Sequence, residues 1–135
     1  MAVSAVVIGR NQAEMVRATL ESLERTVPRE LIEILYVDCG SRDGSPGLEP
    51  DFPGVSFLKM PRNFGWTKAA NIGTRTAKGE YLFLVPPGTV VEPGTIAKLR
   101  AAIEEDPTAN GVSPLEKDEQ GQIVSTGYGL PGADE

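Results

Sequence analysis

Residues 79–94 read Gly-Glu-Tyr-Leu-Phe-Leu-Val-Pro-Pro-Gly-Thr-Val-Val-Glu-Pro-Gly, and this stretch decides the fold. Residues 81–85 are continuously apolar between turn-forming residues, which predicts a β-strand buried on both faces. Pro86 and Pro87 end the strand because proline has no N–H to donate to a neighbouring strand. Pro93 is predicted to open a helix. This order of strand, sharp loop and helix predicts an α/β fold in which ligands bind just past the carboxyl ends of the strands.

Strands and helices alternate through the rest of the chain. Apolar runs predict strands at residues 3–8, 31–37 and 55–60, and amphipathic patterns predict helices at residues 11–26, 67–77 and 93–105. The first of these strands is apolar at nearly every position, as in the centre of a sheet. The alternation predicts an α/β protein with a mostly parallel, doubly wound sheet. After the last helix, residues 111–115 and 122–126 predict a hairpin.

Three local signals predict how the helices begin, end and pack. Asn11 followed by Glu14 is a variant of the capping box, with Asn11 as the N-cap and Glu14 bonding back to its amide. Gly79 is predicted to be the C-cap of the helix at 67–77. Small side chains allow that helix to lie close to the sheet, and its inward-facing residues are predicted to be Ala69, Ile72, Gly73 and Thr76.

The composition favours a single-domain protein of a reducing compartment. The chain has 135 residues, a net charge of −6, one cysteine and no histidine. The negative charge argues against sequence-independent nucleic-acid binding, which requires a basic surface. One cysteine cannot form an intrachain disulfide, and no apolar run approaches the roughly 20 residues of a membrane-spanning helix. We therefore expect a cytoplasmic location and no membrane segment, and any acid–base chemistry must come from side chains other than histidine.

Polar residues gather where the first two predicted strands end. Gly9, Arg10 and Asn11 follow the first strand, and the second strand ends in Asp38-Cys39-Gly40-Ser41-Arg42-Asp43. A carboxylate and backbone amides in such a loop can bind a nucleotide, whereas the same residues also form Asx-turns that only reverse the chain. Asn11 has the same ambiguity, because a helix cap explains it without a ligand. The chain has no G-x-G-x-x-G after its first strand and no P-loop, which argues against a Rossmann oxidoreductase or an NTPase.

Basic residues in the middle of the chain are candidates for holding phosphate. They are Lys59, Arg62, Lys68, Arg75 and Lys78. Lys68 and Arg75 lie seven residues apart and share a helix face, from which they could hold a diphosphate by charge; a solvated helix face is the alternative. Lys68 is the best candidate because it lies in the first helical turn, near the predicted cleft. Cys39 is predicted to be a small buried residue and not a nucleophile, since the chain has no histidine to activate it.

Five segments in this order resemble family 2 glycosyltransferases of the GT-A fold, in the rhamnosyltransferase-like branch. They are residues 3–11, 37–44, 62–84, 89–94 and 111–127, which include Arg62-Asn63-Phe64-Gly65-Trp66 and Ala69-Ala70-Asn71-Ile72-Gly73. The resemblance implies a three-layer α/β/α sandwich and transfer of a sugar from a nucleotide-diphosphate donor. It also implies that the nucleotide sugar is bound by Gly9, Asn11, Asp38, Cys39, Ser41, Asn63, Lys68 and Asn71.

The exit of the strand at 81–85 departs from that family. There the family has an Asp-x-Asp or Asn-Pro-Asp motif whose carboxylates bind Mn²⁺ or Mg²⁺, and the cation bridges the donor phosphates. This chain has Val85-Pro86-Pro87-Gly88 instead, and none of these side chains offers an oxygen ligand. No cofactor and no divalent cation are therefore expected at Val85-Pro86-Pro87. Cys39 is a second departure, because it stands where the family has an Asp or Asn that contacts the nucleoside.

Two functions are consistent with this resemblance. Residues 1–127 are expected to form the nucleotide-sugar-binding domain, and residues 128–135 a flexible tail. The catalytic base and acceptor site of the family lie C-terminal to this region, so we expect the donor half of a sugar transferase that is not active alone, and we assign no catalytic residue. The alternative is a degenerate, non-catalytic GT-A domain that binds a ligand or serves as a scaffold. Further domains of a longer parent chain, or a homo-oligomer, are compatible with both.

Overall fold

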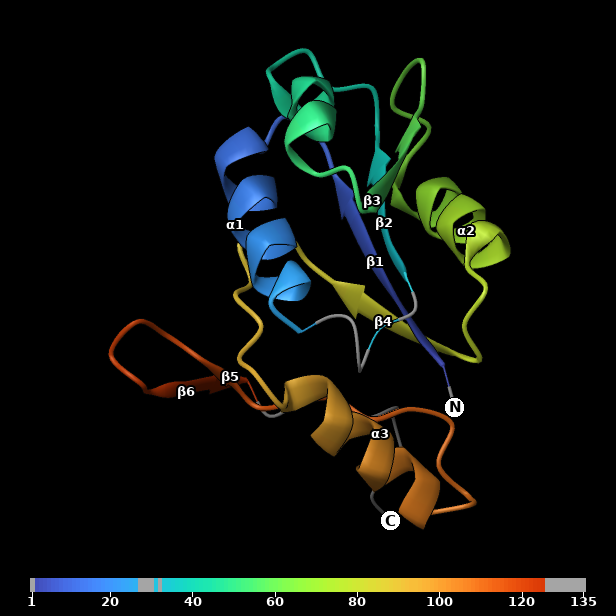
Figure 1. Ribbon diagram of the computed structural model, residues 1–135, viewed down its shortest axis with the longest axis vertical. Helices are drawn as coiled ribbons and strands as arrows, with labels where there is room; N and C mark the ends of the chain where they lie inside the picture. Colours follow the sequence, from blue (N-terminus) through green and yellow to red (C-terminus); the bar gives the residue numbers. More distant parts are fainter. Residues whose placement is uncertain (1, 27–30, 32, 126–135) are drawn as a thin grey trace. The chain divides into compact units, whose positions relative to one another are not determined.

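The computed structural model describes residues 2–26, 31 and 33–125. The chain divides into two compact units, Met1–Pro93 and Gly94–Glu135. The first unit contains the polar loops singled out in the sequence, and the second contains the last helix and the hairpin (Figure 1).

The first unit is built on a four-stranded parallel sheet with the strand order β3-β2-β1-β4. Its strands are β1 (Val3–Gly9), β2 (Glu33–Asp38), β3 (Val55–Lys59) and β4 (Tyr81–Val85). In the register of the sheet, Val7 lies between Tyr36 of β2 and Val85 of β4. All seven residues of β1 are buried. The predicted parallel α/β fold and the central position of the first strand are therefore confirmed.

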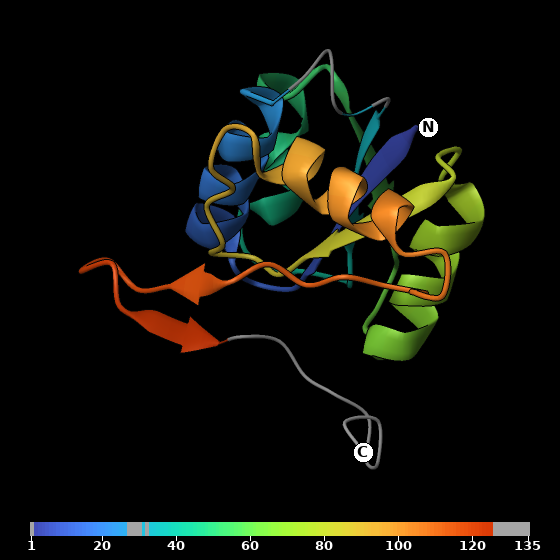
Figure 2. The same ribbon diagram turned by 90° about the horizontal axis from the view of Figure 1, so that it is seen from below.

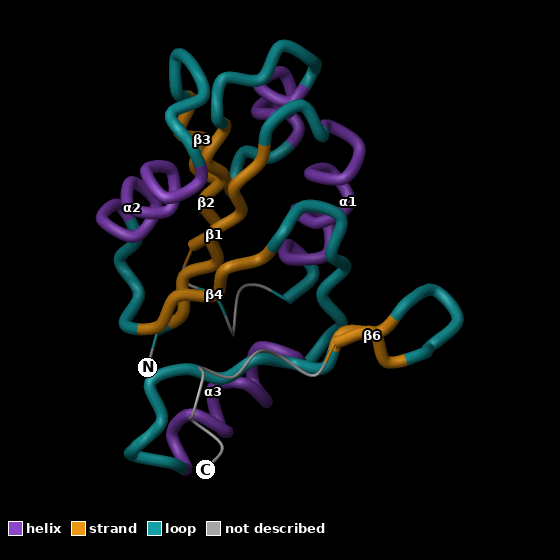
Figure 3. The backbone as a smooth tube through the Cα atoms, turned by 180° about the vertical axis from the view of Figure 1, so that it is seen from behind, coloured by secondary structure: helices purple, strands orange, loops and turns teal. Residues whose placement is uncertain are grey.

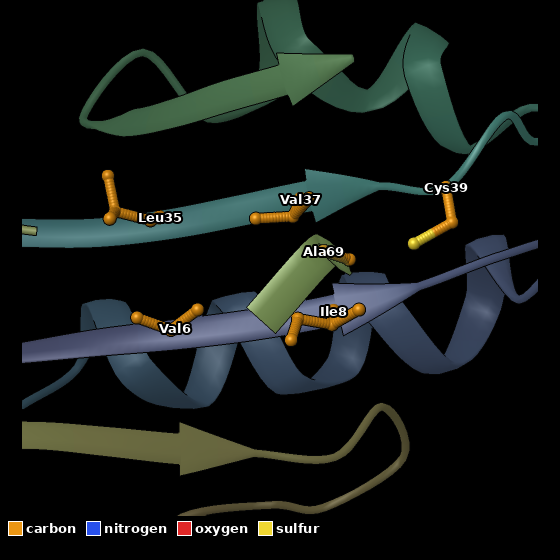
Figure 4. Packing of buried hydrophobic residues seen from close by; sticks show 6 residues of the cluster. All are labelled: Val6, Ile8, Leu35, Val37, Cys39 and Ala69. Atoms are coloured by element: carbon orange, nitrogen blue, oxygen red, sulfur yellow. The ribbon is translucent and has the colours of Figure 1, made fainter. Parts of the chain in front are cut away.

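Helices cover both faces of this sheet, which confirms the three-layer architecture. Helix α1 (Ala13–Glu24) and the 3₁₀ helix η1 (Ser45–Asp51) lie on one face, and α2 (Trp66–Thr76) lies on the other (Figures 1 and 3). Side chains alternate between the faces of a strand. On the α2 face, Val6, Ile8, Leu35, Val37, Cys39 and Ala69 form one apolar cluster (Figure 4).

Helix α2 packs closely because its inward positions are small, as predicted. Ala69 and Gly73 are buried and Ile72 is partly buried, whereas Thr76, which was predicted to face inward, is exposed. A Cβ atom added at Gly73 would lie 2.8 Å from Cγ1 of Val6. The helix backbone therefore rests directly on β1.

Strand β4 is not buried on both faces, so that prediction is wrong. Leu82 is 40% exposed and Leu84 is 47% exposed, while Val85 is buried. Among the described strands, β4 pairs only with β1, at the edge of the four-stranded sheet. Helix α2 packs on β1 and β2. Within the first unit it therefore leaves Leu82 and Leu84 of the edge strand β4 uncovered.

A glycine is required at position 79 because the side chain of Ser4 lies close to its backbone, and not because it caps a helix. Helix α2 ends at Thr76, with Ala77 at the C-cap position, so the predicted cap at Gly79 is wrong. A Cβ atom at Gly79 would lie 2.6 Å from Oγ of Ser4, and the Gly79 amide donates a hydrogen bond of 2.8 Å to that oxygen. Ser4 in turn donates to Oε2 of Glu33, at 2.6 Å. These bonds fasten the turn before β4 to the amino ends of β1 and β2.

The second unit consists of helix α3 (Thr95–Glu105) and an antiparallel hairpin of β5 (Glu116–Lys117) and β6 (Ile123–Ser125) (Figure 2). The helix begins two residues after Pro93. The predicted strand at 111–115 is wrong, because pairing begins only at Glu116. Asp118 closes the turn by accepting hydrogen bonds from the amides of Gln120 and Gln122.

Three sequence-based expectations concern residues outside the described part of the chain. The end of the predicted strand at 126, the domain limit at 127 and the tail at 128–135 all lie there. No helix among the described residues is long and apolar enough to cross a membrane.

We predict that Gly73→Val destabilises the first unit by about 1–3 kcal/mol, the usual range for overpacking a closely fitted core. The added side chain would collide with Val6, which is 1% exposed and has no room to move. The measurement is the free energy of unfolding in urea. Thr74→Val is the matched control, because Thr74 is exposed on the same helix. Equal stabilities of the two variants would show that α2 does not rest on β1.

Candidate functional site

The loops that leave β1 and β2 form the candidate site at the carboxyl edge of the sheet. Gly9 ends β1 and Asp38 ends β2, and the two residues are register partners. The pairing continues one step further, since the Cys39 amide donates to the carbonyl oxygen of Gly9 at 2.9 Å. The sheet thus holds the two predicted loops side by side.

The carboxylate of Asp38 is the centre of these loops. It is 1% exposed and accepts three hydrogen bonds. Oδ1 accepts from the hydroxyl of Tyr36 at 2.7 Å and from Oγ of Ser41 at 2.6 Å, and Oδ2 accepts from the Ser41 amide at 2.9 Å. Asp38 therefore bonds to its own turn, as in the Asx-turn alternative for this loop, and its carboxylate organises the loop from within.

Tyr36 is a residue of the site that the sequence reading missed. Its hydroxyl donates to Asp38, and burial raises the pKa of Tyr36, with the nearby Asp38 carboxylate raising it further. The phenol therefore keeps its proton and acts as a hydrogen-bond donor. The signal was present in the sequence, because residues two apart on a strand point to the same face.

Asn11 joins the two loops and does not cap a helix. It adopts a left-handed conformation with φ of 56°. Its amide donates to Oγ of Ser41 at 2.8 Å, and its Oδ1 accepts from the Arg42 amide at 2.7 Å. Helix α1 instead begins after Gln12, whose side chain makes no capping bond. The predicted capping box of Asn11 and Glu14 is therefore wrong.

Asp43 supplies the cap of α1 from the other loop. Its Oδ2 accepts a hydrogen bond of 3.1 Å from the amide of Ala13, the first residue of the helix, and its Oδ1 accepts one of 2.9 Å from the Ser45 amide. The pKa of Asp43 is lowered chiefly by hydrogen bonding with Ser45, and the Ala13 amide adds to this effect. A carboxylate at a helix N-terminus is also favoured by the helix dipole.

The remaining residues predicted for the site lie in different surroundings. Gly9 is buried, and Cys39 is 4% exposed, within the apolar cluster. Burial raises the pKa of the Cys39 thiol, with Asp38 adding to the effect, so the side chain is a buried thiol as predicted. Asn63 is exposed, and its Oδ1 accepts from the Gly65 amide at 2.9 Å. Lys68 and Asn71 are exposed on α2.

The loop before α2 lies against the loop after β2. Gly40 has φ of 71°, in the left-handed region that favours glycine. A Cβ atom there would lie 2.6 Å from Cα of Arg62 and 3.0 Å from the amide nitrogen of Asn63. The backbones of the two loops are therefore in direct contact at the carboxyl edge of the sheet.

The loop after β4 is fastened to α1 by two buried hydroxyls. Oγ1 of Thr19 donates to the Thr89 carbonyl at 2.8 Å and accepts from the Gly88 amide at 2.9 Å. Oγ of Ser22 accepts from the Val91 amide at 3.0 Å. These bonds fix the path of the backbone that follows Val85.

The side chains of this loop do not fit the divalent cation that the resemblance implies. Such a cation takes oxygen ligands, and Val85-Pro86-Pro87-Gly88 carries none on its side chains. Within the described residues, no three histidine, cysteine, aspartate or glutamate side chains are grouped so that they could hold a metal. No chemical step is therefore assigned to a metal at this loop.

The fold agrees with the family indicated by the sequence motifs. The chain belongs to glycosyl transferase family 2, which it matches over residues 4–127. It is 28% identical over 107 residues to an uncharacterized glycosyltransferase of Haemophilus influenzae, a match that covers 79% of this chain and 36% of that protein. The chain thus spans about a third of the length of this relative.

Solved structures support the same GT-A fold. A mannosyltransferase from Pyrobaculum calidifontis, PcManGT, in complex with GDP-Man and Mn²⁺, matches with a TM-score of 0.76 and 24% identity, over 87% of this chain and 36% of that one. S. aureus TarS 1-349 in complex with UDP-GlcNAc matches with a TM-score of 0.69 and 23% identity, over 78% of this chain and 32% of that one. At these identities the likeness supports the fold alone.

We predict that Asp43→Asn lowers the free energy of unfolding at pH 7 by about 0.5 kcal/mol, the usual effect of a charge at a helix N-terminus. The pKa of Asp43 is lower in the folded than in the unfolded chain, so the stabilisation is present above the unfolded pKa and is lost as the pH falls through the folded pKa. The gap between wild type and Asp43→Asn should therefore close in acid. Urea unfolding between pH 7 and pH 2.5 measures it, with Glu80→Gln as the control. A gap independent of pH would contradict the cap.

Proposed function

We propose that this chain is the donor-binding part of a nucleotide-sugar transferase and that it is not active by itself. The observation that carries the proposal is the bond network from Asp38 through Ser41 to Asn11, which fixes two loops together at the carboxyl edge of a parallel sheet. Ligands of open α/β sheets bind at that edge. Membership in glycosyl transferase family 2 supports a nucleotide-diphosphate sugar as the ligand.

The proposed roles follow from how exposed each residue is. Gly9 and Cys39 shape the floor of the nucleoside site through their backbones, because their side-chain positions are buried. Asp38 holds the loop from within, and Asn11 and Ser41 form its rim. Lys68, Asn63 and Asn71 lie on the exposed surface at α2 and the loop before it, so they would face the diphosphate and sugar.

One observation favours a second candidate, a non-catalytic GT-A domain that serves for binding or as a scaffold. The loop at residues 85–88 offers no carboxylate for a cation that would stabilise the charge of the leaving diphosphate. In this candidate the nucleotide-binding loops are kept and transfer is lost. The two candidates differ in whether any sugar is transferred by the chain or by a longer protein that contains it.

We predict that UDP, GDP or dTDP binds the chain and that Ser41→Ala weakens binding about tenfold. The hydroxyl of Ser41 donates to Asp38 within its own loop and accepts from the Asn11 amide of the other loop. A net loss of about 1–1.5 kcal/mol corresponds to a tenfold weaker affinity. Isothermal titration with each nucleotide, in EDTA and again with Mn²⁺, measures it. Ser56→Ala, an exposed change on β3, is the control. Unchanged affinity in Ser41→Ala would place the nucleotide elsewhere, and strong dependence on Mn²⁺ would refute the degenerate candidate.

We predict that Val85→Asp combined with Pro87→Asp introduces Mn²⁺ binding, because the two carboxylates would stand where the family holds its cation. The pair should cost roughly 1–3 kcal/mol of stability without metal, since Val85 is 4% exposed and a buried polar group lacks partners there. Titration with MnCl₂ and thermal unfolding with and without Mn²⁺ measure both effects. Val85→Asn with Pro87→Asn is the uncharged control. Failure of the acidic pair to bind Mn²⁺ would count against the alignment of this loop with the family motif.

A further inference from the structure

We infer that Arg62 and Lys68, held on the ring of Phe64, form an anion site that takes the diphosphate of the nucleotide. The inference rests on the proposed function and adds to it the groups that would neutralise the phosphates. It assigns to two side chains of this chain the charge that a divalent cation supplies in a metal-dependent transferase.

The geometry of the site is a phenyl ring with two cations. Cζ of Arg62 lies 4.8 Å from the centroid of the Phe64 ring, and Nζ of Lys68 lies 4.7 Å from it. Both distances are within the roughly 6 Å over which a cation is attracted to an aromatic face. The Phe64 ring therefore contacts both positive groups, although their like charges repel.

In the part of the chain that the structure describes, no acidic side chain is paired with either cation. Among the described residues, neither Arg62 nor Lys68 takes part in an ion pair. Both residues are exposed, and Phe64 is 37% exposed. Two unpaired cations fixed on one ring attract a ligand with several adjacent negative charges, and a diphosphate has that form. A single carboxylate would leave one of the two cations unpaired.

The site lies next to the loop proposed for the nucleoside. The backbone of Arg62 touches Gly40, the residue before Ser41. Helix α2 begins at Trp66, so Lys68 lies in its first turn. The carboxyl edge of the sheet therefore carries both the Asn11–Ser41 rim and the two cations. A nucleoside diphosphate needs neighbouring sites for its nucleoside and for its phosphates.

Two of the other basic residues singled out in the sequence, Lys59 and Arg75, do not form such a pair. Nζ of Lys59 lies 2.6 Å from Oε1 of Glu49, so its charge is already paired. Arg75 is in the last turn of α2, and seven residues of helix separate it from Lys68 by about 10 Å. Sequence spacing suggested Arg75 as the partner of Lys68, whereas the structure brings Lys68 together with Arg62.

Comparison of UDP with uridine isolates the contribution of the phosphates. Binding to the full chain is measured by isothermal titration in EDTA, so that no divalent cation contributes. Trp66 is the only tryptophan of the chain, is 60% exposed and lies two residues from both Phe64 and Lys68, so its fluorescence reports occupancy of the site. We expect UDP to bind at least tenfold more tightly than uridine, and to lose that advantage as salt screens the charges.

The variants test which cations are responsible. Arg62→Gln with Lys68→Gln should weaken UDP binding about tenfold and leave uridine binding unchanged, because only the phosphates lose a partner. Phe64→Leu should weaken UDP binding less, since both charges remain but are no longer held together. Arg75→Gln with Lys78→Gln removes the same charge from the other end of α2 and should change nothing. Thermal unfolding of every variant shows that each is folded.

The outcomes separate this inference from the proposed function. If UDP and uridine bind equally, or if the Arg62/Lys68 double variant binds UDP like the wild type, the anion site is refuted and nucleotide binding stands. If none of UDP, GDP, dTDP and uridine binds, the proposed function is refuted. Titration with inorganic pyrophosphate then tests the anion site separately. A change of Trp66 fluorescence in the wild type and not in the double variant supports the anion site. No change in the wild type refutes it.

Discussion

The loops at the carboxyl edge of the sheet depend on the buried carboxylate of Asp38. It is almost fully withdrawn from water, and it retains hydrogen bonds because Tyr36 and Ser41 supply donors in place of solvent. A buried polar group without such partners would cost about 1–3 kcal/mol. The Ser41 hydroxyl, which is bonded to Asp38, also accepts a hydrogen bond from the Asn11 amide. The carboxylate of Asp38 therefore stabilises both the turn after β2 and the loop that follows β1. A rigid rim of this kind is prepared for a ligand before the ligand arrives, which reduces the entropy lost on binding.

Two surfaces surround this rim, and they differ in what they can offer a ligand. On one side, the loop after β4 is tied to α1 through Thr19 and carries no side-chain oxygen ligand over residues 85–88. On the other side, the loop before α2 presents unpaired cations on an aromatic ring. The proposed anion site would place the phosphates of a bound nucleotide at the second surface, away from the loop at residues 85–88 that lacks carboxylates. With the proposed anion site, the family relationship and the departure at residues 85–88 would be compatible, because charge neutralisation would have a different source.

The sequence correctly predicted the order of helices and strands in the first unit. Its predictions were wrong where the role of a residue depends on contacts with residues distant in sequence. The continuous apolar run of β1 predicted a central strand correctly, since all its residues are buried. The similar run of β4 was misleading, because hydropathy does not show how far α2 extends over the sheet. Asn11 was predicted to be a cap from local rules, whereas Asp43, thirty residues away, caps α1 and leaves Asn11 free to bond to the second loop. Gly79 likewise follows from the proximity of Ser4.

The sequence by itself determined the parallel α/β architecture, the family and the two loops that end β1 and β2, because these follow from periodicity and from motifs that are local or keep their order along the chain. Only the tertiary structure decided what the polar side chains do. In the structure, Asp38 is buried and accepts a hydrogen bond from Tyr36, and Asn11 bonds to Ser41. Arg62 and Lys68 both contact the Phe64 ring. The physical reason is that a hydrogen bond or a cation–π contact requires two groups to lie within a few ångströms of each other. Those distances are set by how the helices and strands pack together, which the sequence does not show directly.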